Sequence, residues 1–592
     1  MKKTTKVSKK EDHLMKTVLE DIKVKVSPTI KKDRLSIRDL IWNYPIYLLT
    51  LFKRLIPLSY IILFGFIGFC IAVFLQSNTF ASLLERRSGN DMLIEGVVGT
   101  VNSLNPLFVT NNYIDRSIDS LVFEKFIYLN KDGDPRPGIA KNWEVKEGGL
   151  VIDFSINEGL FWDNGSKLTI DDILFTFDTA VKLSESSTDF DSVGSSLKGV
   201  EIERLDDWSI RFKLKEANPI FFQAVSIYII PQASFENVQI NQIPFAPFTK
   251  NPIGSGKYKI SKMDSGSVTL VDNPYDKYEP NIKTVVFKLY PDAKSLEMAF
   301  RTGQLDAIGS WDKFQTDYVN EYPRFVEYEK IIKHREKIIF LNIRKDSLKS
   351  KEMRKALSLL LNKEELIKNY GVGGEILNGP LPSTSWAYNS TIEYDKYDPE
   401  KAAELLKNLG YTKNSESGYY ESSNGEILRF SISYFESLSN ERLVSLLVEN
   451  YKKEGIYIKE EKLTYSQITQ EIIATRDFEM LLYEVETNID PDQYNLWHSL
   501  KSNYPDLNLS GYNYQRVDIL LEEGRQSLNR EIRKQKYTLF QRYLVADTPA
   551  IFLYNPSYEY IVRDNLVGID LGSDLVSHSY ERFYNIEQWV WK

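Results

Sequence analysis

An uninterrupted apolar run near the N-terminus limits what this chain can fold into more than any other feature of its sequence. From Leu55 to Leu75 it reads LIPLSYIILFGFIGFCIAVFL, 21 residues without a charge. A helix of that length spans the roughly 30 Å hydrocarbon core of a bilayer. Helices buried in protein cores are seldom so long and so uniformly apolar. The run therefore predicts a single transmembrane helix, which we place at residues 55–76.

The charges on either side of the run predict its orientation. Residues 1–54 hold 14 Lys and Arg against 6 Asp and Glu, a net charge of +8. The whole chain carries −8, which leaves −16 for residues 55–592. Because Lys and Arg next to a membrane span stay in the cytoplasm, we expect a cytoplasmic basic tail over residues 1–54 and an extracytoplasmic main part. Within the tail, Leu40–Phe52 has the composition of a segment that lies along the inner membrane surface.

A cleaved signal peptide is the alternative to a permanent anchor. Thr79-Phe80-Ala81 would serve as a cleavage site. However, signal peptides usually have about 15–30 residues, whereas the basic leader alone has 54 here. We therefore favour an uncleaved, single-pass anchor in the cell membrane and leave cleavage after Ala81 open. Cys70 does not fit a lipid-modified cysteine, because it follows Phe69 and more apolar sequence comes after it.

Cysteine and histidine usage excludes several kinds of site. The one cysteine lies inside the apolar run, so no disulfide framework and no cysteine-based zinc site can form. The four histidines are scattered, with no H-x-x-x-H pair. The stretch IGSGK at Ile253–Lys257 suggests a phosphate-binding loop, but Tyr258 stands where Ser or Thr is needed. We therefore expect a protein that is not an enzyme and that binds no metal, no cofactor and no nucleic acid.

The part beyond residue 90 predicts a mixed α/β fold, because strand-like runs alternate with helical patterns. Asp398-Pro399 supplies a helix cap and a first-turn proline, and Gly410 supplies a stop. The runs that predict strands are Leu150–Ile156, Ser209–Leu214, Thr284–Leu289 and Ile338–Ile343, and those that predict helices are Ser295–Thr302, Lys351–Leu361, Pro399–Leu409, Leu438–Glu454 and Glu531–Val545.

The segment FWDNGSKLTIDDILFTF at Phe161–Phe177 predicts a tight turn followed by a helix. Asp163-Asn164-Gly165 has the composition of a turn. Thr169 is placed to cap the helix, and Asp172, three residues later, can close a capping box. The apolar residues that follow recur at helical spacing and form one face to be buried. We interpret this segment as structural, a helix that docks on a sheet.

The same segment, together with others in a fixed order, resembles the family 5 extracellular solute-binding proteins, which serve peptide and nickel ABC importers. The likeness covers about 500 residues, and Lys257 stands where the family usually has Pro. The matching stretches are SLNPLF (Ser103–Phe108), LVFEKFIYLNKDGDPRPGIAKNWEV (Leu121–Val145), GLFWDNGSKLTIDDILFTF (Gly159–Phe177), NPIGSGKYKI (Asn251–Ile260), GQLDA (Gly303–Ala307), MRKALSLLLNKEELI (Met353–Ile367), DPEKAAELLKNLGY (Asp398–Tyr411), NLSGYNYQRVDILLEE (Asn508–Glu523) and DTPAIFLYNP (Asp547–Pro556).

The resemblance implies a two-lobed α/β fold of the periplasmic-binding-protein type (type II, cluster C). Lobe I would comprise residues 91–310 with 551–592 returning to it, and lobe II residues 311–550. It also implies a monomeric, non-catalytic protein that holds a peptide or another small molecule between the lobes and delivers it to ABC permease subunits. The alternative is a membrane-tethered sensor or surface-interaction protein without an importer, which the uncleaved anchor and the long inner tail would suit.

In peptide-binding members of the family, an aromatic-x-x-Asp segment supplies the carboxylate that pairs with the ligand's α-ammonium. The corresponding region here is LLYEVETNIDPDQYNLW, Leu481–Trp497. With one inserted residue, Tyr483 and Glu486 take the places of the aromatic residue and the acid, with Asp490 following. Without the insertion, Thr487 would stand at the acid position and the anchor would be lost. We prefer the first register, because a buried ammonium needs a paired carboxylate. In a third reading, these acids form a solvated loop.

Three further aromatic residues fall where the chain would cross between the lobes. They are Trp386 and Tyr388, in PSTSWAYNS, and Trp311, which follows DAIGS. Each could line the ligand cleft or belong to a core.

Overall fold

The computed structural model describes residue 67 and residues 91–108, 112–186, 193–310, 325–370, 374–573, 576 and 578–592. The chain divides into two compact units, Met1–Leu83 and Leu84–Lys592. Apart from Ile67, the predicted membrane helix Leu55–Leu75 lies outside the described residues, as does Trp311. Among the residues that are described, no helix is both long and apolar enough to cross a membrane.

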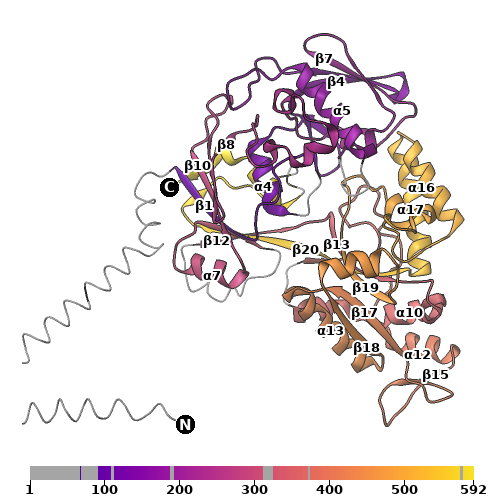
Figure 1. The fold of residues 1–592 in the computed structure, drawn as a ribbon. Helices are drawn as coiled ribbons and strands as arrows, with labels where there is room; N and C mark the ends of the chain where they lie inside the picture. Colours follow the sequence, from indigo (N-terminus) through magenta and orange to yellow (C-terminus); the bar gives the residue numbers. More distant parts are fainter. Residues whose placement is uncertain are drawn as a thin grey trace, which may run out of the picture. The chain divides into compact units, whose positions relative to one another are not determined.

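A 12-stranded sheet runs through the second unit (Figure 1). β12 (Phe325–Ile331) and β14 (Gly374–Ile376) pair with its central strand from outside the main path. Along that path the order is β18 (Tyr457–Leu463), β17 (Arg429–Phe435), β19 (Met480–Glu486), β13 (Arg335–Leu341), β20 (Ala550–Arg563), β11 (Ala307–Ser310), β1 (Met92–Val98), β10 (Thr284–Tyr290), β9 (Ser267–Asp272) and β8 (Tyr258–Met263).

Buried apolar residues form separate cores at the two ends of this sheet, and these define the two lobes. The core of the first lobe uses residues between 93 and 332 and again between 558 and 589. The cores of the second lobe use residues between 338 and 554. The chain therefore enters the first lobe, crosses to the second and returns.

The strand β20 belongs to both lobes. Its first part pairs with β13, through Ala550 to Tyr554, and its second part pairs with β11 and β12. Between the two parts, the Nδ2 atom of Asn555 donates to the carbonyl oxygens of Lys333 (3.0 Å) and Arg335 (2.9 Å). These bonds tie β20 to the turn at which the chain passes from β12 to β13.

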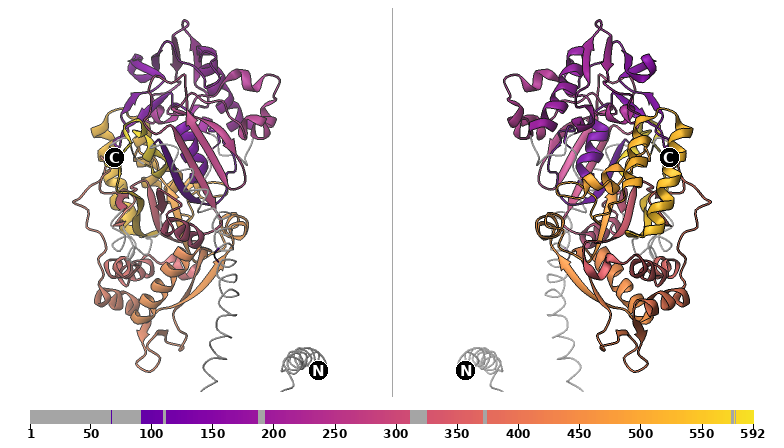
Figure 2. Two further views of the ribbon diagram at one scale, coloured as in Figure 1. Left: turned by 90° about the vertical axis from the view of Figure 1, so that its left-hand side faces the viewer. Right: turned by 90° about the vertical axis from the view of Figure 1, so that its right-hand side faces the viewer.

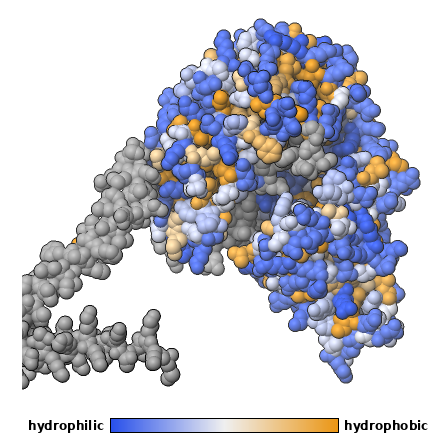
Figure 3. Space-filling model, viewed as in Figure 1, coloured by the Kyte–Doolittle hydropathy of each residue, from blue (hydrophilic) through white to orange (hydrophobic). Residues whose placement is uncertain are grey.

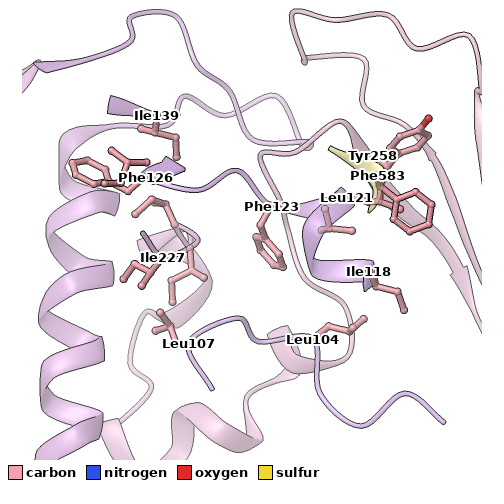
Figure 4. Close-up of a cluster of buried hydrophobic side chains, with 14 of the residues drawn as sticks. Leu104, Leu107, Ile118, Leu121, Phe123, Phe126, Ile139, Ile227, Tyr258 and Phe583 are labelled. Atoms are coloured by element: carbon pink, nitrogen blue, oxygen red, sulfur yellow. The ribbon is translucent and has the colours of Figure 1, made fainter. Parts of the chain in front are cut away.

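The first lobe is built around an aromatic core. A four-stranded antiparallel sheet of β4 (Ala140–Lys146), β5 (Val151–Ile156), β7 (Ser209–Lys213) and β6 (Glu201–Arg204) packs against α5 (Ile170–Ser186). The ring of Phe126 lies 5.0 Å from that of Phe154 and 5.2 Å from that of Phe177, centroid to centroid. Figure 4 shows Phe583, from the end of the chain, beside Tyr258 and Leu121 in the same core.

The second lobe has an apolar core on each face of its sheet, because side chains alternate along a strand. Ile339 packs with residues of α10, α11, α12 and α13 on one face, and Phe340 packs with residues of α16 and α17 on the other (Figures 1 and 2). The helices are α10 (Lys351–Leu359), α11 (Lys363–Tyr370), α12 (Pro399–Asn408), α13 (Leu438–Glu454), α16 (Gln515–Gln526) and α17 (Arg530–Asp547).

Most of these helices and strands lie close to the residues that local sequence signals predict. The carboxylate of Asp398 accepts from the backbone N–H of Lys401 at 3.0 Å, at the start of α12. Asp172 accepts from the backbone N–H of Thr169 at 2.9 Å, which confirms its contribution to the predicted capping box of α5. The exception is β13, which was expected over residues 338–343 and begins instead at Arg335. Its first three residues are charged and pair with the charged end of β19.

Candidate functional site

The carboxyl ends of three strands meet at one edge of the second lobe. β17 runs parallel to both β18 and β19, so all three end on the same side. Ligands of open α/β sheets bind outside such ends. Glu486 is the last residue of β19. In the space-filling view, the molecular face is hollowed where the two lobes meet (Figure 3).

Two cations of the chain itself contact the carboxylate of Glu486. The Nη1 atom of Arg116, on α4 (Tyr113–Val122), lies 3.0 Å from Oε1 and 2.9 Å from Oε2. The Nε2 atom of His578 lies 3.1 Å from Oε1. Arg116 and His578 lie in the first lobe and Glu486 in the second, so this cluster joins the lobes. The side chain of Glu486 is 37% exposed, against 25% for Arg116 and 16% for His578.

Burial alone would raise the pKa of Glu486. The hydrogen bonds and charges of His578 and Arg116 overcome that effect and hold the pKa of this carboxyl at about 2. Burial alone would lower the pKa of His578, but the carboxylates of Glu486 and Glu581 raise it above its ordinary value. At neutral pH the cluster therefore contains an ionised carboxylate between the guanidinium of Arg116 and an imidazole whose cationic form it favours.

Aromatic rings hold both cations in place. The guanidinium of Arg116 lies 4.6 Å from the ring centroid of Tyr580, and the His578 ring stacks on the same ring at 4.9 Å. A second imidazole, that of His334, lies 6.0 Å from His578. Burial, together with the charge of His578, lowers the pKa of His334 to about 4. The pKa values of the two histidines are thus shifted in opposite directions, upward for His578 and downward for His334.

The structure does not bring Tyr483 to this cluster. Residues three apart on a strand point to opposite faces. Tyr483 pairs with Ile338 and packs against the core that α16 and α17 cover, whereas Glu486 pairs with Arg335 on the other face. On that second face, the neighbouring Glu484 forms ion pairs with Arg335 and, at 3.0 Å, with Lys337.

Asp490 and Trp386 meet at a different point, around Arg533 of α17. The guanidinium of Arg533 donates to both oxygens of Asp490, at 2.8 and 2.5 Å. The Trp386 ring lies 5.3 Å from Arg533 and 4.7 Å from Arg530. Tyr388 is apart from both and stacks on Tyr394, with ring centroids 6.3 Å apart.

The two lobes also meet beside α17. The Nη1 atom of Arg530 lies 3.8 Å from Oδ1 of Asp134, which belongs to the first lobe. Nearby, Gly149 leaves room for Leu528: a Cβ atom at Gly149 would lie 2.4 Å from the Cδ1 atom of Leu528. The lobes therefore touch at a polar cluster around Glu486 and at a second patch around Arg530.

Sequence reasoning singled out Glu486 but not the residues that contact it. Arg116 is 370 residues away along the chain, and nothing in its local sequence marks it. His334 and His578 were treated as scattered, although the fold brings them together. Among the described residues, no group of three or more His, Cys, Asp or Glu could hold a metal ion.

Comparisons with known proteins agree on one family. Residues 134–506 match the model of the bacterial extracellular solute-binding proteins, family 5 Middle, which confirms the resemblance found in the sequence. The oligopeptide-binding protein AppA of Bacillus subtilis is 25% identical over 527 residues, 87% of this chain and 94% of that protein.

Solved structures support the two-lobed α/β fold. AppA of Bacillus subtilis in complex with a nonapeptide superposes with a TM-score of 0.69 at 23% identity, over 85% of this chain and 99% of that one. NikZ of Campylobacter jejuni in complex with Ni(L-His) superposes with a TM-score of 0.70 at 24% identity, over 85% and 100%. At these identities the likeness concerns the fold alone.

Proposed function

Because the chain belongs to the bacterial extracellular solute-binding proteins of family 5, we propose that it captures a peptide or peptide-like molecule between its lobes and delivers it to the permease of an ABC importer. The observation that carries this proposal is the cluster around Glu486. It joins residues of both lobes at the carboxyl ends of parallel strands, where ligands of such sheets bind. The oligopeptide-binding relative that matches 87% of this chain supports a peptide as the ligand.

We propose Glu486 as the residue nearest the ligand, with Trp386, Tyr388, Asp490 and Trp311 around the same cleft, whereas Tyr483 packs on the opposite face of the sheet. Asp490 and Trp386 would contribute by holding Arg533, since their contacts with it fix the loop that follows β19. For the lobes we retain the bounds 91–310 with 551–592, and 311–550. The separate cores support a division into two lobes near these bounds, although Ile332 belongs to the core of the first lobe and Tyr554 to a core of the second.

The test is the recovery of a ligand. Residues 91–592 would be produced alone and purified, and small molecules released by denaturation would be identified by mass spectrometry. We expect peptides, in amounts approaching one per protein molecule. Recovery of a non-peptide molecule at that ratio would replace the peptide ligand. A protein that releases nothing and binds no added peptide would contradict the proposed function.

We further propose that Leu55–Leu75 anchors the protein in the cell membrane, with residues 1–54 in the cytoplasm and the lobes outside. The length of the apolar run and the +8 charge of the residues before it support this orientation. Protease added to intact cells or spheroplasts should digest the lobes and spare the tail. Protected lobes would contradict the orientation, and a mature N-terminus at Ser82 would show cleavage instead of anchoring.

The basic tail, residues 1–54, also supports a second candidate function, that of a membrane-tethered sensor. Measuring uptake of a labelled peptide separates the two functions. Cells that lack the gene should lose uptake if the protein serves an importer and should keep it if the protein is a sensor.

A further inference from the structure

We infer that the ligand brings no free ammonium group to Glu486, and that a hydrogen-bond acceptor of the ligand, a peptide carbonyl or a carboxylate, faces Arg116 instead. The inference rests on the proposed function, since it concerns one end of a ligand held between the lobes. It also separates this chain from peptide binders in which an acid at this place pairs with the α-amine.

The carboxylate of Glu486 already has its counterions. Arg116 contacts both of its oxygens, at 3.0 and 2.9 Å, and His578 contacts Oε1 at 3.1 Å. One negative charge thus lies between the guanidinium of Arg116 and an imidazole that it favours in the cationic form. A ligand ammonium would add a third cation at about 3–4 Å from the other two, where like charges repel strongly outside bulk water.

Neither cation can leave Glu486 without cost. Arg116 lies over the Tyr580 ring, and His578 stacks on the same ring. The backbone N–H of His578 also donates to the carboxylate of Glu581 at 3.1 Å. If an ammonium took Glu486, these two groups would remain in a partly buried position without their shared counterion, and such unpaired charges are unfavourable.

The other carboxyl groups of the cluster are not available to an ammonium either. Glu581 forms an ion pair with Lys125 at 3.1 Å besides accepting from His578. Asp119 lies one turn along α4 from Arg116 and is 6% exposed. Burial, together with the charge of Asp115, raises the pKa of Asp119 well above its usual range and so favours its neutral form.

Arg116 has side-chain N–H groups that do not donate to Glu486. Within the part of the chain that the structure describes, both of its side-chain hydrogen bonds leave from Nη1. A guanidinium has five N–H groups in a fixed plane, so those on Nη2 and Nε can donate to a ligand. Carboxylate and carbonyl oxygens suit such a planar donor, and a carboxylate binds it more strongly.

Matched peptides test the inference. Residues 91–592 would be titrated calorimetrically with alanine peptides from the dipeptide to the nonapeptide, each with a free and with an acetylated amino terminus. We expect the two Kd values of each pair to agree within about threefold. A loss of about 30-fold or more on acetylation, typical of a buried ammonium–carboxylate pair, would overturn the inference and leave the proposed function intact. If no peptide of either form binds, the proposed peptide ligand fails, and the inference fails with it.

Two variants sharpen the test. Arg116→Met combined with His578→Asn removes both internal counterions, so this protein should bind the free peptide about tenfold or more tightly than the acetylated one. Arg116→Lys alone keeps a positive charge. Like the wild type, it should bind the free and the acetylated peptide with similar Kd values. Lys182→Met, which removes an exposed cation of α5 paired with Asp178, is the matched control. Equal binding of both peptide forms by the double variant would contradict the role of the internal counterions.

A measurement on the wild-type protein tests the same inference without depending on whether the variants fold. Only His334, His498 and His578 lie in residues 91–592, so imidazole resonances can be assigned by NMR. When peptide is added, the pKa of the His578 ring should stay above its ordinary value, because Glu486 remains its partner. A fall of this pKa below its ordinary value on binding would show that the ligand has taken Glu486, and would overturn the inference.

Discussion

Glu336, on β13, is a buried acid to which the described residues bring no ion pair. Its side chain is fully buried, and the structure gives Oε2 no hydrogen-bond partner among the described residues. The hydroxyl of Thr487 lies 3.4 Å from Oε1. Burial raises the pKa of Glu336 to about 8, although the bond from Thr487 opposes the shift. This carboxyl therefore keeps its proton at neutral pH.

Replacing Glu336 should change how stability depends on pH. The folded-state pKa of about 8 lies above the unfolded value of 4.5, so between these values the folded protein holds a proton that the unfolded chain has lost. The contribution of this group to stability is therefore complete below about 4.5 and is lost as the pH rises through about 8. Glu336→Gln cannot ionise, and it should raise the free energy of unfolding at pH 8 by about 1–4 kcal/mol relative to the wild type.

Urea unfolding of residues 91–592 at several pH values measures this effect. Glu327→Gln, at an exposed position of the neighbouring β12, is the control and should follow the wild-type curve. Parallel pH curves for wild type and Glu336→Gln would mean that Glu336 is ionised in the folded protein.

At the scale of secondary structure, the sequence predicts features that depend on contacts between near neighbours in the chain. It does not predict features that depend on pairing between distant residues. Asp398 and Asp172 cap helices through contacts three residues away, which a sequence displays directly. The start of β13 depends on pairing with β19, about 150 residues later, so the charged residues Arg335 to Lys337 gave no strand signal. Tyr483 and Glu486 could have been separated from the sequence, since strand alternation puts residues three apart on opposite faces. The partners of Glu486 could not, because only the fold brings Arg116 to it.

The ion pair between the loop after β19 and α17 should be a structural requirement. The side chains of Asp490 and Arg533 are 13% and 6% exposed, and breaking a buried pair leaves the remaining charge uncompensated. Asp490→Asn should lower the free energy of unfolding by about 3 kcal/mol. Glu523→Gln breaks a more exposed pair between α16 and α17, with Lys536, and should cost at most about 1 kcal/mol. Thermal or urea unfolding compares the two, and similar losses would contradict the assigned role of Asp490.

At the scale of the whole described unit, two lobes share β20 and touch again around Glu486 and around Arg530. The contact around Arg530 includes a 3.8 Å ion pair, which is loose. The contact around Glu486 is tighter and involves three charged groups. Much of the electrostatic attraction between the lobes therefore depends on a single carboxylate.

Removing that charge should let the lobes separate. In Glu486→Gln, Arg116 and His578 of the first lobe lose their ionised partner in the second lobe, so the electrostatic attraction across this contact is lost. Small-angle X-ray scattering of the ligand-free protein should then give a larger radius of gyration than the wild type. Glu441→Gln breaks a surface pair with Lys462 inside the second lobe and should leave the scattering unchanged. Identical curves for Glu486→Gln and wild type would show that the closed arrangement does not depend on this carboxylate.

The position of β20 has a consequence for the order in which the molecule can be made. The ribosome adds this strand after all the strands with which it pairs, yet it lies in the middle of the sheet and pairs with both lobes. Phe583 and Trp589, later still, belong to the core that Leu93 begins. Neither lobe can complete its structure while the chain is still emerging, so more than four hundred residues must wait with apolar surface uncovered. A nascent chain of this kind needs protection from aggregation until β20 and the core residues that follow it have been added, and a stop codon before β20 would destroy both lobes at once.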